Sequence, residues 1–107
     1  MEHNRLLLQL EQTRKDINRK TINPEIKTLA LSDIKPIVEL VAVARAEYVA
    51  ELFSLAEASK GEGATGNVSR LRELRETFEE LVAAANALET MIKRGYVDVA
   101  GSLAADR

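Results

Sequence analysis

The strongest pattern in the chain is a run of apolar residues spaced alternately three and four apart over 68–94. This alternation keeps its members on one side of an α-helix and is typical of helices that pack as in coiled coils. The stripe consists of Leu71, Leu74, Phe78, Leu81, Ala85, Leu88 and Ile92. Gly95 suits a left-handed cap, with Tyr96 folding back towards Met91. We therefore predict a long helix over 68–94 that ends at Gly95.

A second long helix is predicted from about Ile34 or Ile37 to Ser59. Asp33 is the expected cap, which places Pro36 in the first turn, where proline costs little. The main apolar stripe consists of Ile34, Ile37, Val41, Ala44, Tyr48, Leu52 and Leu55. Further apolar residues lie beside it, among them Val38, Ala42, Val49 and Phe53. A helix with so wide an apolar surface is expected to be covered on more than one side.

The beginning of the chain predicts an amphipathic helix from about Asn4 to Lys20, with Leu6, Leu10, Thr13 and Ile17 on one face. Asn, Pro and Glu at 23–25 are typical of a helix start and predict a short helix from Pro24 to about Ala30. At the other end, 96–107 has no helical period. We expect a short extended piece over 96–99 and a flexible C-terminal tail over 97–107.

The two long helices predict an antiparallel hairpin around the glycine-rich segment 60–67. With the turn at Gly63, Tyr48 meets Phe78, and Leu52 and Leu55 face Leu74 and Leu71. Two stripes recognised separately thus interlock, and such agreement between local pattern and fold favours the hairpin. We expect one all-α domain over 1–107: this hairpin plus the shorter N-terminal helix, a three- to four-helix bundle completed by oligomerisation.

Composition leaves little area for a core. Hydrophobic residues make up 46% of the 107 residues, but aromatics only 4%. Small chains with thin cores often gain stability from a partner. The formal net charge of -2 argues against bulk attraction to nucleic acid, and the chain contains no cysteine for disulfides or thiolate chemistry. We expect no membrane span and a cytoplasmic location.

The hairpin leaves a second apolar face on the central helix, which the N-terminal helix covers in part. This face predicts a protein–protein interaction module, such as an adaptor, an assembly component or a small chaperone-like subunit, that binds itself or a partner helix. A homo-oligomer is expected, with a dimer favoured. The candidate interface consists of Leu6, Leu10, Ile17, Val38, Ala42, Val49 and Phe53.

The sequence gives less support to dinucleotide binding, metal binding, catalysis or nucleic-acid binding. Gly61 to Gly66 matches the dinucleotide fingerprint, but a helix precedes it instead of a strand, so a hairpin loop is the better interpretation. His3 is the only histidine, so we expect no metal site. We also expect no cofactor and no enzymatic activity. A basic cluster in the first helix offers possible anion contacts and an alternative function in nucleic-acid association. It consists of Arg14, Lys15, Arg19 and Lys20.

Overall fold

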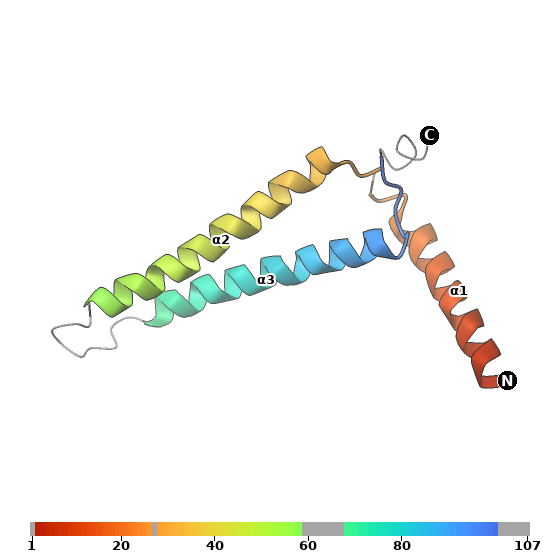
Figure 1. Ribbon diagram of the computed structural model, residues 1–107, viewed down its shortest axis with the longest axis horizontal. Helices are drawn as coiled ribbons and strands as arrows, with labels where there is room; N and C mark the ends of the chain where they lie inside the picture. Colours follow the sequence, from red (N-terminus) through yellow and green to blue (C-terminus); the bar gives the residue numbers. More distant parts are fainter. Residues whose placement is uncertain (1, 27, 59–67, 101–107) are drawn as a thin grey trace. The chain divides into compact units, whose positions relative to one another are not determined.

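The computed structural model describes residues 2–26, 28–58 and 68–100, and three α-helices lie in these ranges. They are α1 (Glu2–Ile22), α2 (Leu31–Ala58) and α3 (Val68–Lys93) (Figure 1). The all-α class is thereby confirmed. The expected turn at Gly63 and the whole glycine-rich motif lie outside the described residues. Contacts group the chain into two compact units: 1–34 with 87–107, and 35–86. We describe each unit by itself.

The unit 35–86 is the antiparallel hairpin, in which α2 and α3 run side by side (Figure 1). Tyr48 and Phe78 face each other with ring centroids 5.9 Å apart and planes tilted by 32°. The Arg45 guanidinium carbon lies 5.1 Å from the centroid of the Phe78 ring, within the range of a cation–π contact. The predicted pairing of Tyr48 with Phe78 is therefore confirmed.

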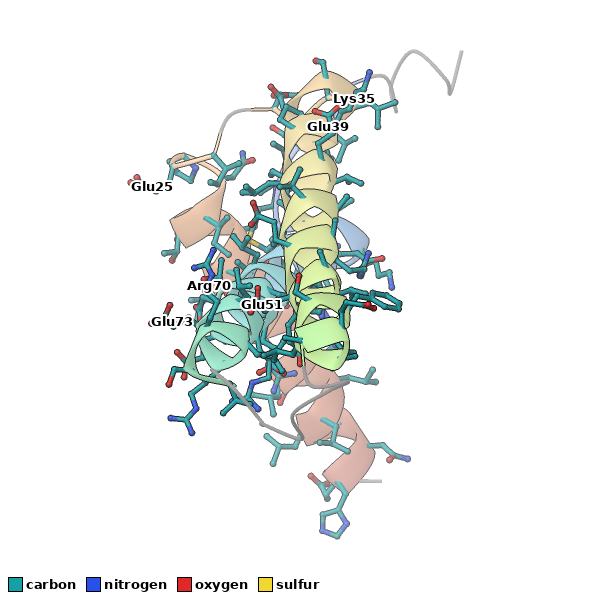
Figure 2. All side chains as sticks on the ribbon, turned by 90° about the vertical axis from the view of Figure 1, so that its left-hand side faces the viewer. Glu25, Lys35, Glu39, Glu51, Arg70 and Glu73 are labelled. Atoms are coloured by element: carbon teal, nitrogen blue, oxygen red, sulfur yellow. The ribbon has the colours of Figure 1, made fainter. Side chains whose placement is uncertain are left out.

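The seam of this hairpin follows the predicted stripe of α3. Leu74 is its most buried member, with 9% of its surface exposed, and Ala44 on α2 is 5% exposed. Leu52 departs from the prediction, because it is 54% exposed while Glu51 is half-buried. Figure 2 shows Glu51 on the flank of α2 towards α3. The seam residue that follows Tyr48 is therefore Glu51, three positions later, and not Leu52, four positions later. With Glu51, the spacings of three and four alternate along the whole seam of α2. Assigning Leu52 to the seam is wrong.

The start of α2 differs from the prediction. The helix begins at Leu31, and the Asp33 carboxylate accepts a hydrogen bond of 2.9 Å from the Ala30 N–H. Asp33 thus caps from inside the first turn. The short helix expected from Pro24 is wrong: the described residues form turns, in which the N–H groups of Glu25 and Ile26 bond the Ile22 carbonyl. The chain leaves α1 by a tight turn and does not start a new helix.

The end of α3 forms the predicted Schellman motif. The Tyr96 N–H bonds the Met91 carbonyl at 2.9 Å, and the Gly95 N–H bonds the Ile92 carbonyl at 3.2 Å. Gly95 has φ +73, a conformation that residues with a Cβ rarely adopt. The cap turns the chain sharply, so that the residues after Gly95 run back into their own unit.

The segment after this cap is the core of the unit formed by 1–34 and 87–107. Tyr96 and Val97 are 7% and 3% exposed, and Leu29 and Val99 form a parallel β-bridge. Leu29 donates to the Asp98 carbonyl at 2.9 Å and accepts from the Ala100 N–H at 2.7 Å. The short extended piece is confirmed, whereas the flexible tail is wrong for 97–100. Residues 101–107 lie outside the described residues.

Candidate functional site

The exposed flank of α2 carries a second regular stripe beside the seam, which we call the second stripe. Its members alternate spacings of four and three: Leu31, Lys35, Val38, Ala42, Arg45, Val49, Leu52 and Ala56. From Lys35 onwards, each member follows a seam position by one residue or by four, so the second stripe is rotated from the seam by about 100° at most. Its large apolar members are exposed. α2 therefore has two adjacent faces of coiled-coil type, one of which the hairpin uses.

The candidate interface residues are all exposed. On α2, Val38, Ala42 and Val49 belong to the second stripe, and Phe53 lies next to it with 70% of its surface exposed. On α1, Leu6, Leu10 and Ile17 share one face, as their spacings predict. Each set is therefore brought together on its own helix. The two sets belong to different units of the chain.

The face of α1 that contacts its own unit is the one opposite these leucines. The Arg19 guanidinium donates to the Gly95 carbonyl at 2.8 Å and forms an ion pair with the Asp98 carboxylate. The Lys15 side chain lies against Gly95, where a Cβ atom would be 3.5 Å from Lys15 Cε. Both cations thus lie at the carboxyl end of α3, where positive charge is favourable.

Asp98 is the centre of this attachment, which we call the Asp98 clasp. Its carboxylate accepts from Arg19 and from the Asn23 amide, the latter at 3.3 Å. Its backbone N–H donates to Asn23 Oδ1 at 3.0 Å, and its carbonyl accepts from Leu29. The hydrogen bond from Arg19, followed by that from Asn23, lowers the pKa of Asp98 from its ordinary value of 3.8. The clasp therefore stabilises the ionised carboxylate.

This lowered pKa predicts that acid opens the clasp. A group whose folded pKa lies below its unfolded value stabilises the fold above the unfolded value and loses that contribution as the pH falls through the folded one. The pH is lowered from neutral until it has passed below the folded pKa of Asp98, and the chemical shift of the Leu29 amide is followed by NMR. In the wild type this shift should move towards the value of an amide that no longer donates to the Asp98 carbonyl. An Asp98→Asn variant should show a much flatter profile.

The matched control is Asp16→Asn, which changes an exposed aspartate on α1 that accepts a hydrogen bond from Gln12 at 3.0 Å. It should retain the wild-type pH dependence at Leu29. If the pH dependence of the Leu29 amide shift in Asp98→Asn coincides with that of the wild type, a titratable group other than Asp98 controls this segment.

The basic cluster of α1 is divided by the fold. Arg19 is bonded to the Gly95 carbonyl within the Asp98 clasp, and Lys20 is exposed. Arg14 and Lys15 line a surface pocket of about 260 Å³ together with Arg94, which lies outside the predicted basic cluster. The pocket is completed by Leu8, Glu11, Gln12 and Tyr96. Arg94 was missed because it lies in the α3 cap, far from α1 in sequence.

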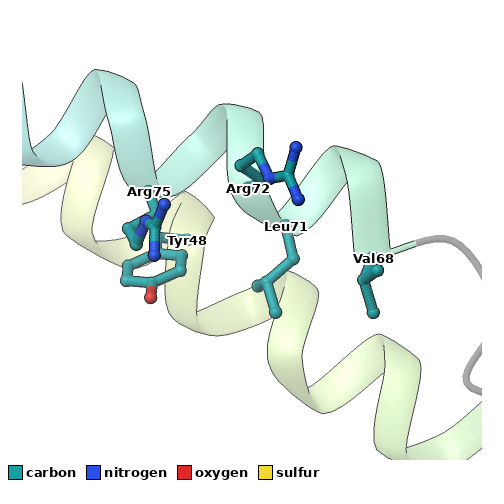
Figure 3. Close-up of a pocket in the computed structure, with 5 residues that line it drawn as sticks. All are labelled: Tyr48, Val68, Leu71, Arg72 and Arg75. Atoms are coloured by element: carbon teal, nitrogen blue, oxygen red, sulfur yellow. The ribbon is translucent and has the colours of Figure 1, made fainter.

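A second surface pocket of about 200 Å³ lies on the hairpin near the first turns of α3 (Figure 3). It is lined by Tyr48, Val68, Leu71, Arg72 and Arg75. Figure 3 shows the Arg75 side chain beside the Tyr48 ring, so the pocket is basic and aromatic at one end. Within 2–26, 28–58 and 68–100, no group of three or more His, Cys, Asp or Glu side chains could hold a metal ion.

Comparison with known proteins finds no matching family model, no matching curated protein and no matching solved structure. In the part of the chain that the structure describes, none of the helices has the length and apolar character needed to cross a membrane.

Proposed function

We propose that this protein is a helical protein–protein interaction module that acts through the second stripe of α2. A partner helix would lie along Val38, Ala42 and Val49 and complete a helical bundle, with Phe53 at the edge of the contact. The observation that carries this proposal is the second stripe itself. It repeats with coiled-coil spacing, and its large apolar side chains are exposed.

The energetics of burial support this reading. Burying apolar surface contributes roughly 25 cal/mol per Å², so a row of exposed valine, leucine and phenylalanine side chains favours association. Neighbouring exposed apolar residues of this extent usually mark an interface. Lys35 also fits, since its aliphatic stem can cover apolar surface while its charge stays in water. The Arg45 guanidinium, by contrast, lies over the Phe78 ring of α3. We accordingly propose an adaptor or assembly role.

A role in nucleic-acid association has less support. Affinity for nucleic acid depends on how many phosphates the protein neutralises. Arg19 is already bonded to Asp98 and to the Gly95 carbonyl. Arg94 replaces it beside Arg14 and Lys15, but Glu11 lines the same pocket and approaches Arg14 at 3.9 Å. The basic patch is therefore small and partly compensated.

The substitution Phe53→Asp tests the proposed surface. It should weaken association by at least about tenfold, because a carboxylate would have to be desolvated at the edge of the contact. The far-ultraviolet circular dichroism should remain that of a helical protein, since Phe53 is exposed and away from the seam. Sedimentation velocity of the full chain, and co-purification of partners from cells, measure the association.

The matched control is Val43→Asp, which places the same charge on an exposed face of α2 away from the second stripe. Both variants lose some helix propensity, so the difference between their association strengths reports the effect of the substituted position alone. If Phe53→Asp sediments and co-purifies as the wild type does, this flank of α2 is not the interface.

A further inference from the structure

The surface pocket formed by α1 and the cap of α3, which we call the cap pocket, gathers charges of mainly one sign. Its volume is about 260 Å³, and its lining residues all belong to one unit of the chain. Among the described residues, the cations of the lining are Arg14, Lys15 and Arg94, and its one carboxylate is that of Glu11. Three cations and one carboxylate give the cap pocket a formal net charge of +2. Its volume lies just below the usual range of sites for drug-sized molecules, so it suits a small ligand.

The cations of the cap pocket are available to a ligand. In the part of the chain that the structure describes, neither Lys15 nor Arg94 forms an ion pair. Arg14 approaches Glu11 at 3.9 Å, but the two side chains are 45% and 70% exposed, and surface pairs of this kind contribute little. The negative end of α3 already has a cation, because the Arg19 guanidinium donates to the carbonyl of the cap glycine. An anion that enters the cap pocket therefore has few existing contacts to displace.

Tyr96 gives the cap pocket a hydroxyl on a side chain that is otherwise held in the core. Only 7% of this residue is exposed. Its hydroxyl has no hydrogen-bond partner within the described residues, although every buried side-chain oxygen of these residues has one. The hydroxyl therefore lies in the small exposed part of Tyr96. Because Tyr96 lines the cap pocket, it offers a ligand a donor that is already fixed in position.

We propose that the cap pocket binds the phosphate group of a small phosphomonoester. Such a group carries about −1.5 to −2 charges at neutral pH, which matches the net charge of the cap pocket, whereas a carboxylate carries a single charge. Arginine and lysine are frequent partners of phosphate in proteins. Leu8 adds apolar surface for the organic part of the ester. The cap pocket shares no residue with the second stripe, so the two proposals can be tested separately.

Titration of the full chain with phenyl phosphate, followed by NMR, tests the proposal. The amide shifts of 94–98 should change in a saturable manner. The dissociation constant should be at least about tenfold below that of benzoate, which has the same ring and a single charge. Lys15→Gln and Arg94→Gln should each weaken binding of phenyl phosphate about tenfold, because each removes a charged donor. Tyr96→Phe should weaken it about threefold, since only a neutral donor is lost.

The matched control is Lys20→Gln, which removes the same charge from an exposed position of α1 outside the cap pocket. It should bind phenyl phosphate as the wild type does. Lys15 and Arg94 are exposed, so their variants should keep the wild-type circular dichroism. Amide shifts of 94–98 that do not saturate, or equal weakening by Lys20→Gln, overturn the site. Equal affinity for benzoate overturns its preference for phosphate, and equal affinity for inorganic phosphate overturns the assignment to an ester.

Discussion

Leu74→Ala should lower the free energy of unfolding by about 2–3 kcal/mol, in the lower part of the range for buried leucines. Leu74 is 9% exposed and is the most buried member of the α3 stripe. Truncation removes its apolar contacts with α2 and leaves a cavity that the two helices cannot fully close. Urea denaturation followed by circular dichroism measures the change as a lower midpoint at an unchanged slope.

The matched control is Leu40→Ala, the same truncation at an exposed position of α2 that belongs to neither stripe. It should change the free energy of unfolding by less than about 0.5 kcal/mol, as is usual for surface positions. All proteins are compared at one concentration, because self-association adds to apparent stability. Equal effects of the two truncations would show that Leu74 does not lie in a packed seam.

Val97→Asp should detach the segment after the α3 cap, with a cost of more than about 3 kcal/mol for an unpaired charge at a buried position. Val97 is 3% exposed, the lowest exposure among the core residues of the described chain. The backbone hydrogen bonds of Leu29 and Ala100 depend on this segment, so hydrogen exchange of their amides should become fast. The amides of α2 and α3 within 35–86 should remain protected.

Here the control is Val43→Asp, because Val43 is 55% exposed and the substitution is identical. It should leave the exchange of the Leu29 and Ala100 amides as in the wild type. Slow exchange of these amides in Val97→Asp would mean that the cap segment tolerates a charge and does not form the core of its unit.

The sequence alone determined the features that depend on neighbouring residues. The alternating spacings predict α3 and its seam, because the period of an α-helix brings such residues to one face. Gly95 and Tyr96 predict the Schellman cap, since a left-handed residue and a returning N–H are local requirements. The pairing of Tyr48 with Phe78 also follows, because two regular stripes joined by one loop have few registers in which they interlock.

The tertiary structure decided what depends on contacts between distant residues. Leucine and glutamate both suit a helix, so only packing against α3 shows that Glu51 is on the seam side and that Leu52 is exposed. Arg19 belongs to a basic cluster in the sequence, but Asp98, far along the chain, makes it a structural anchor. Local periodicity carries no information about such partners, because they are brought together by the fold and not by their spacing.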